Sequence, residues 1–132
     1  MTYMVRGVRG ATTVSKNNAE TIIEATKELL LTMIEANGLE EEHIASVFFT
    51  TTPDLDAAYP AQAARKIGWT QTALMGMQEM NMQGGLTHCI RILVHWNTTK
   101  EIQEINHVYL HQANQLRPDL VKTRDELNGG KF

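Results

Sequence analysis

Two residues of opposite charge flank a glycine turn near the middle of the sequence. Glu79 precedes Gly84 and Gly85, and Arg91 follows them, directly before the apolar residues 92–94. A charge at the mouth of a buried strand is costly unless it is paired or used. The spacing therefore indicates that this carboxylate and this guanidinium belong to a site.

Further arginines are expected near the ends of strands and helices: Arg6, Arg9, Arg65 and Arg117. Arginine binds carboxylates through two parallel hydrogen bonds. With Glu79 and the phenol of Tyr109, these residues suggest a pocket for a small dianion whose hydroxyl donates to the glutamate. Simpler explanations remain open: the first two arginines as solvent-facing strand residues, and Arg65 as a cation at a helix end. Spacing alone does not show that the side chains converge.

The sequence contains none of the common catalytic or phosphate-binding signatures: GxGxxG, the P-loop, GxSxG and CxxC are missing. His107 and His111 share one strand face in this prediction but have no carboxylate in register, which argues against a metal site. We interpret Cys89 as a small buried residue rather than a nucleophile. The other histidines are expected to be structural or solvated: His43, His88 and His95.

Length and composition indicate an ordinary globular chain. The 132 residues are 42% hydrophobic and 20% charged, with a net charge of -3, which speaks against a general nucleic-acid binder. A single cysteine favours a reducing compartment, and we find no secretory signal and no apolar run of about 18 residues. We expect a cytoplasmic protein without membrane contact. Residues 1–120 are predicted to form one domain and residues 121–132 a mobile tail.

Hydrophobic periodicity predicts seven elements. A helix over 16–36 has an apolar stripe at 3.6-residue spacing, with Asn17 or Asn18 at its start and Gly38 after its end. A shorter helix begins at Tyr59 or Pro60 and ends at residue 67. The predicted strands cover residues 3–14, 44–52, 72–80, 89–96 and 107–113.

This order fits an α+β fold, a five-stranded mixed sheet with two helices on one face. Arg6 and Arg9 are an odd number of residues apart, so an ideal strand points them to opposite faces. Several strands are apolar on both alternations, as Phe48 and Phe49 illustrate. Two helices cannot cover both faces, so self-association is expected.

Four segments together resemble the AroH-class chorismate mutases, in register from about residue 4 to residue 120: RGVRGATT, TTPDLDAAYPAQAAR, MQEMNMQGGLTHCIR and HVYLHQANQLRPDL. The resemblance implies a homotrimer with a pseudo-α/β-barrel core and active sites in the clefts between subunits. The implied reaction is the Claisen rearrangement of chorismate to prephenate, in the biosynthesis of phenylalanine and tyrosine. It implies no metal and no organic cofactor.

The resemblance also implies roles for particular residues. Arg91 would stabilise charge on the ether oxygen of the breaking bond, and Glu79 would accept the ring hydroxyl. Arg9 and Tyr109 would contact carboxylates, and Arg117 would help to close the site. The remaining implied substrate contacts are Arg65, Tyr59, Gln62, Met75, Gly76 and Leu116.

Three positions depart from the family pattern. Many members have phenylalanine at Tyr59, lysine at Gln62 and cysteine at Gly76. The changes at Gln62 and Gly76 affect the cleft rather than Arg91 or Glu79, so activity is expected to remain while affinity is altered. Two alternatives stay open: an imine or enamine deaminase of the YjgF type, and a trimeric carboxylate-sensing module without turnover.

Overall fold

The computed structural model describes residues 2–120; the predicted tail over 121–132 lies outside them. The two helices and five strands follow one another in the predicted order. Their bounds are β1 (Met4–Thr13), α1 (Ala19–Asn37), β2 (Ile44–Thr51), α2 (Ala61–Lys66), β3 (Ala73–Gln78), β4 (Cys89–Thr98) and β5 (Val108–Tyr109). The short 3-10 helices are η1 (Glu41–His43), η2 (Ile102–Glu104), η3 (His111–Gln115) and η4 (Pro118–Leu120).

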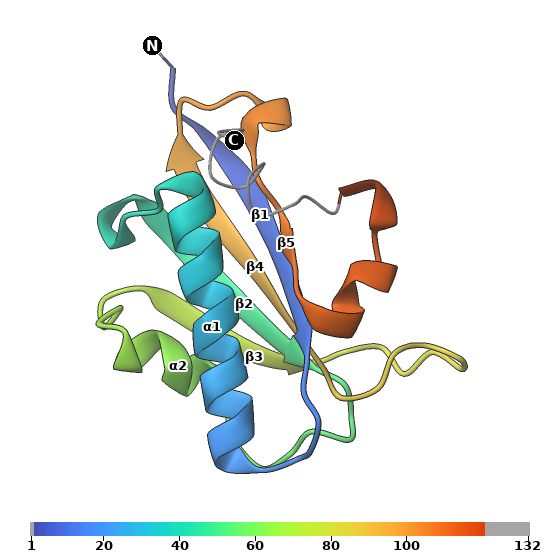
Figure 1. Ribbon diagram of the computed structural model, residues 1–132. Coiled ribbons are helices and arrows are strands. Elements are labelled where there is room, and N and C mark those ends of the chain that lie inside the picture. The colour runs from blue at the N-terminus through green and yellow to red at the C-terminus, as the bar shows by residue number, and fades with distance from the viewer. Residues whose placement is uncertain (1, 121–132) are drawn as a thin grey trace.

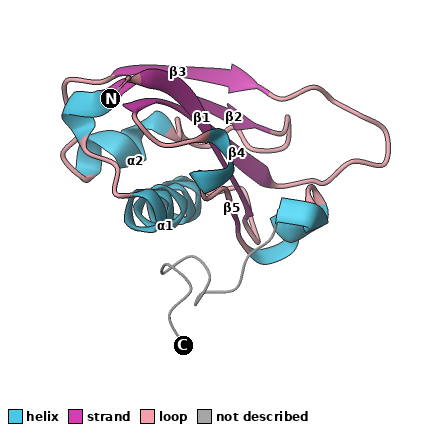
Figure 2. Cartoon of the chain, turned by 90° about the horizontal axis from the view of Figure 1, so that it is seen from above, coloured by secondary structure: helices cyan, strands magenta, loops and turns pink. Residues whose placement is uncertain are grey.

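The five strands form one mixed sheet in the order β3-β2-β4-β1-β5. The central strand β4 is antiparallel to both β2 and β1, and the edge strands β3 and β5 run parallel to their neighbours. Both α-helices lie on the same side of this sheet (Figures 1 and 2). The predicted α+β architecture is therefore confirmed.

Helix α1 has the ends that its sequence predicts. The side chain of Asn18 accepts a hydrogen bond from the Thr21 N–H at 2.8 Å and so caps the first turn. Gly38 follows the last turn in the left-handed conformation, with φ 74°, and its N–H donates to the Ile34 carbonyl. The apolar stripe between these caps is what binds α1 to the sheet.

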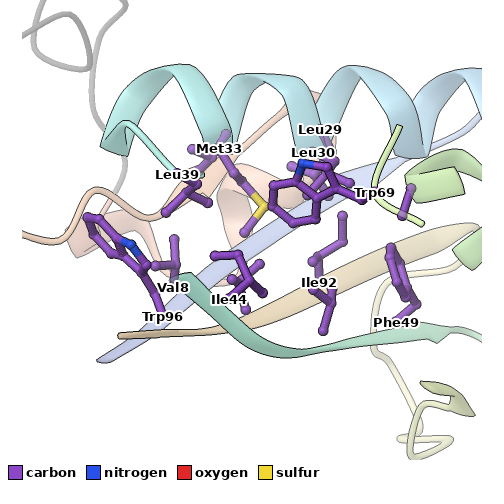
Figure 3. Packing of buried hydrophobic residues seen from close by; sticks show 14 of the residues in the cluster. Val8, Leu29, Leu30, Met33, Leu39, Ile44, Phe49, Trp69, Ile92 and Trp96 are labelled. Atoms are coloured by element: carbon purple, nitrogen blue, oxygen red, sulfur yellow. The ribbon is translucent and has the colours of Figure 1, made fainter. Parts of the chain in front are cut away.

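The core fills the space between α1 and the sheet (Figure 3). Leu30 and Met33 of α1 are fully buried and face Val8 of β1 and Ile92 of β4. Gly10 lets the helix approach closely, because a Cβ atom there would collide with the Met33 sulfur. This packing fixes the sheet on which the site is built.

Strand alternation separates Arg6 from Arg9, as predicted. Val8, which lies between them, is buried under α1, whereas Arg9 is exposed and paired with Leu93 on the opposite face. Arg6 is on the helix side near the start of β1, where its Nε donates to the Lys100 carbonyl at 3.1 Å. We call the face of the sheet opposite α1 the open face. Only Arg9 can therefore serve a site on the open face.

Three predicted boundaries need correction. The strand predicted over 107–113 is only two residues long, because His111 takes a φ of 54° and opens the 3-10 helix η3. His107 and His111 consequently do not share a strand. Pro60 precedes α2 as its N-cap instead of lying in its first turn, and Glu79 lies just beyond the end of β3 instead of inside it.

Apolar side chains also occupy the face of the sheet that carries no helix in the described part of the chain. Phe48 and Leu93 are half-buried there, and Met75 and Met77 of β3 are 54% and 45% exposed. This is the second apolar face expected from the sequence. Over residues 2–120, no helix has the length and apolar character needed to cross a membrane.

Candidate active site

Glu79 and Arg91 meet at the end of the sheet. The Arg91 Nε lies 3.4 Å from the Glu79 Oε2. Arg91 is the third residue of β4, and its side chain lies on the open face. Glu79 follows the end of β3, where its N–H donates to the Thr51 carbonyl at 2.8 Å. The glycine-containing loop over 80–88 thus returns the chain so that the two charges become neighbours.

Thr50 fixes the orientation of the glutamate. Its hydroxyl donates a 2.6 Å hydrogen bond to Glu79 Oε2, the same oxygen that faces Arg91. Among the described residues, the Oε1 atom makes no hydrogen bond or ion pair, and the side chain is 27% exposed. The second oxygen is therefore available to accept a hydrogen bond from a ligand.

A cavity of about 450 Å³ opens beside this pair on the open face of the sheet, within the size range of small-molecule sites. Its walls are mainly apolar, with Phe48 and Leu93 among them. Its charged and phenolic lining residues are Arg9, Glu79, Arg91 and Tyr109. Four of the residues singled out from the sequence are thus brought together by one chain.

Tyr109 and Arg9 reach this cavity from adjacent strands. The pair β1–β5 places Tyr109 opposite Ala11, and the Arg9 N–H donates to the His107 Nδ1 at 2.9 Å, just before that pairing begins. The imidazole thus extends the ladder by one hydrogen bond. This short parallel pairing is what brings a late phenol beside an early arginine.

The segment after β5 supplies two further predicted residues. Leu116 lines a second cavity, which also borders Glu79 and Arg91. Arg117 is bound to Asp119 through two hydrogen bonds, of 3.1 and 2.9 Å. This pairing raises the pKa of Arg117 and lowers the pKa of the Asp119 carboxyl. Arg117 is thus paired locally in this structure.

The other predicted contacts lie elsewhere on the chain. Tyr59, Gln62 and Gly76 line a third cavity, between the start of α2 and the end of β3. Arg65 and Met75 are exposed and line none of these three cavities. A single chain therefore assembles only part of the predicted set.

Cys89 is buried at the start of β4, as expected from the sequence. Burial raises the pKa of its thiol, and the charge of nearby Arg91 acts in the opposite direction. Within residues 2–120, the acidic and histidine side chains that cluster closely enough for a metal ion are Glu40, Glu42 and His43. They lie at the other end of β2 from Glu79.

Sequence reasoning missed two polar residues at this site, Thr50 and Asp54. Both belong to the run TTTPD at the end of β2, to which we assigned a strand end and part of a family-like segment but no role at the site. His88, expected to be isolated, is bound to Asp54, with 3.2 Å between its Nδ1 and Oδ2. The three threonine hydroxyls followed by an aspartate, in residues 50–54, were the sequence signal that could have indicated these contacts.

Comparison with known proteins gives one consistent family. The model of the family described as chorismate mutase type I matches residues 5–120. A chorismate mutase AroH from Thermus thermophilus is 49% identical over 118 residues, which cover 89% of this chain and 97% of that protein. Its counterpart from Bacillus subtilis is 42% identical over 123 residues, with coverages of 92% and 97%. The solved structure of a chorismate mutase from Clostridium thermocellum is 54% identical, with a TM-score of 0.81 over 83% of this chain and 97% of that chain.

Proposed function

This chain belongs to the type I chorismate mutase family and is a chorismate mutase, and from that premise we propose that Arg91 and Glu79 are its central catalytic residues. The observation that carries the proposal is their 3.4 Å contact at the edge of a cavity that also holds Arg9 and Tyr109. The reaction converts chorismate to prephenate by an intramolecular Claisen rearrangement. One C–O bond breaks and one C–C bond forms within the same molecule, so no co-reactant is required.

Positioning is the first contribution of the site. Chorismate carries two carboxylates, and its reactive form folds the enolpyruvyl side chain over the ring. We assign the carboxylate contacts to Arg9 and Tyr109, and the ring hydroxyl to the available oxygen of Glu79. The site holds the two reacting carbons close together, so the entropy cost of reaching the reactive conformation is met on binding. In comparable systems this positioning lowers the activation free energy by several kcal/mol.

Electrostatic stabilisation is the second contribution. Negative charge grows on the ether oxygen as the C–O bond lengthens. Arg91 is a fixed cation whose place is set by β4 and by Glu79, so it can meet this charge with little reorganisation. No nucleophile and no proton transfer are needed, which agrees with a site built from guanidinium, carboxylate and phenol groups.

We further propose a homotrimer in which each site lies between two subunits. The residues Tyr59, Gln62 and Gly76 gather in a cavity of their own, apart from Arg91. The apolar open face also needs a cover that the described chain does not supply. We assign the first group to the site of the neighbouring subunit, with Arg65 and Met75 beside it. Arg117 and Leu116 would close the site after chorismate enters, and a cytoplasmic location remains a prediction.

Variants of Arg91 test the catalytic assignment. Arg91→Ala is expected to lower kcat by about 10²–10³-fold or more, because the pre-placed charge is lost. Arg91→Lys keeps a cation at this position and should retain far more turnover. The disappearance of chorismate is followed by ultraviolet absorbance, and prephenate is identified as the product. Near-normal turnover by Arg91→Ala would contradict the electrostatic account. If the wild-type protein bound chorismate but did not convert it, the result would instead indicate the carboxylate-sensing module.

A further inference from the structure

We propose that the strand-end segment, residues 50–54, sets the distance between the two catalytic charges, and that Asp54 in it is a positioning residue for Arg91. The inference rests on the proposed roles of Glu79 and Arg91. Of the residues in this segment, only Thr50 lines the cavity that holds Arg9, Arg91 and Tyr109. The segment binds both ends of the loop that separates the two charges.

The first end of the loop is held by Thr50 and Thr51. The Thr51 carbonyl accepts the Glu79 N–H at 2.8 Å, which fixes the backbone of the glutamate. The Thr50 hydroxyl donates to Glu79 Oε2 at 2.6 Å, which fixes its carboxylate. Two successive residues of β2 thus determine both the place and the orientation of this side chain.

The second end is held by Thr52. Its N–H donates to the Cys89 carbonyl at 3.0 Å, and its hydroxyl accepts the Cys89 N–H, also at 3.0 Å. Cys89 is buried and opens β4. Arg91 follows two residues later in the same strand, on the opposite face of the sheet from the buried Ile90. The register fixed at Cys89 is therefore also the register of Arg91.

Asp54 completes this attachment through His88. Its two carboxylate oxygens accept the His88 N–H at 3.2 and 2.9 Å, and Oδ2 also lies 3.2 Å from the His88 Nδ1. The Thr52 hydroxyl donates to Oδ1 at 2.5 Å. Asp54 therefore orients the very hydroxyl that receives the Cys89 N–H.

The backbone of His88 shows why such an anchor is needed. Its φ is 53°, in the left-handed region that side-chain-bearing residues seldom adopt. Its carbonyl accepts the Val14 N–H at 2.9 Å, so His88 is held both by the residue that follows β1 and by the strand-end segment. Between the anchored ends, Met80 and Met82 are 77% and 66% exposed. Neither of these exposed side chains is packed firmly enough to hold the loop in place of the two anchors.

A carboxylate suits this place better than an amide. Asp54 receives hydrogen bonds from a hydroxyl and a backbone N–H, and its third neighbour is an imidazole nitrogen. Asparagine would offer one accepting oxygen and would turn an N–H₂ group toward these donors. Asp54→Asn should therefore loosen the start of β4 while preserving side-chain volume.

Steady-state kinetics with chorismate test the proposal. Asp54→Ala should lower kcat by about tenfold or more while KM changes by less than about threefold, because a displaced cation weakens the transition state more than the bound substrate. Asp54→Asn should fall between wild type and Asp54→Ala. If Asp54→Ala does not fold, as judged by thermal melting, Asp54→Asn decides the question. Wild-type kcat in a folded Asp54→Asn and Asp54→Ala would overturn the proposal.

Glu41 provides a matched control. This carboxylate also accepts a threonine hydroxyl and backbone N–H groups, from Thr72 and Gln71, but it joins the chain before β2 to the chain before β3. Glu41→Gln is expected to leave kcat unchanged. An equal loss of kcat in Glu41→Gln and Asp54→Asn would show a general loss of structure, which would overturn the positioning role.

A double variant separates an effect through Arg91 from an independent one. If Asp54 acts by placing Arg91, then Asp54→Ala should cost less than about threefold further in an Arg91→Lys background, because residues that act as a unit are not additive. A full additional loss would overturn the proposal. A wild-type chain that fails to convert chorismate in the same assay would overturn the proposed function instead, so the two failures are distinguishable.

Discussion

Asp54 loses hydration on folding and gains hydrogen bonds in its place. Burial alone would raise the pKa of this carboxyl. The hydroxyl of Thr52, the backbone N–H of His88 and the charge of the His88 ring together outweigh burial, so the pKa lies below its ordinary value. The folded protein thus holds the ionised form more firmly than the unfolded chain does.

This shift predicts how stability depends on pH. A carboxyl whose pKa is lowered by folding contributes stability above its unfolded pKa, about 3.9, and that stability is lost as the pH falls through the folded value. The melting temperature of Asp54→Asn should therefore lie below that of wild type near pH 7, and the difference should shrink below about pH 4. Thermal melts followed by circular dichroism at several pH values measure it. A constant difference from pH 7 to pH 3 would assign the effect to packing.

Single residues also show how far the sequence can predict the site. Glu79 and Arg91 could be predicted because a charged side chain beside a buried strand is costly unless it is paired or functional. Thr50 and Asp54 could not, since their importance depends on the β2–β4 register, which brings Thr52 to Cys89. Threonine and aspartate after a strand are common turn residues, so their types alone carry little information.

At the scale of elements, the contact between α1 and β1 is unusually close at one point. Gly10 lies directly under Met33, and a Cβ there would also come within 3.2 Å of Leu29. Gly7 is on the same strand but on the open face, where a Cβ would meet only Leu93, at an ordinary 3.5 Å. The two glycines therefore have different reasons to be present.

Substituting these glycines separates the two cases. Gly10→Ala should destabilise the fold by about 1–3 kcal/mol, because the buried Met33 side chain has to move in a filled core. Gly7→Ala is the matched control, with an expected change below about 0.5 kcal/mol. Denaturant unfolding measures both. If the two variants were equally stable, the helix would not be held at the distance that Gly10 permits.

Helix α1 and the final strand show what local sequence patterns can and cannot predict. The sequence predicts α1 closely because its period, its Asn18 cap and its Gly38 terminus agree. The final strand is predicted too long, since residues 107–113 alternate plausibly while the backbone at His111 turns away. At that turn the His111 Nε2 lies 3.2 Å from Glu28 of α1, far away in the sequence, and local periodicity carries no information about such contacts.

At the scale of the whole molecule, one chain presents two separate parts of the proposed site. One cavity holds Arg91 and Glu79, and another holds Tyr59 and Gln62. If trimerisation brings them together, size-exclusion chromatography with light scattering should give about three times the chain mass of 14.8 kDa. Leu93→Asp, on the apolar open face, should abolish both the trimer and the activity.

Mixing Arg91→Ala and Arg65→Ala in equal amounts tests the shared site directly, because each variant alone is expected to have little activity. Arg91→Ala and Arg65→Ala each remove a residue assigned to a different subunit of the same cleft. When they are refolded together, about a quarter of the sites should combine an intact Arg91 with an intact Arg65, if chains assort at random into rings. Activity should reappear in the mixture at about that fraction of wild type. If the mixture formed trimers but recovered no activity, both arginines would belong to a site within one subunit.

The anchoring of the loop over 80–88 also bears on how this protein can change during evolution. Both ends of the loop are bound to the successive residues 50–52, at and just after the end of β2, so its length does not set the distance from Glu79 to Arg91. Insertions or deletions near Gly84 are therefore separated from the proposed catalytic pair by two sets of hydrogen bonds. The loop is therefore a place where the sequence can change while Glu79 and Arg91 keep their positions.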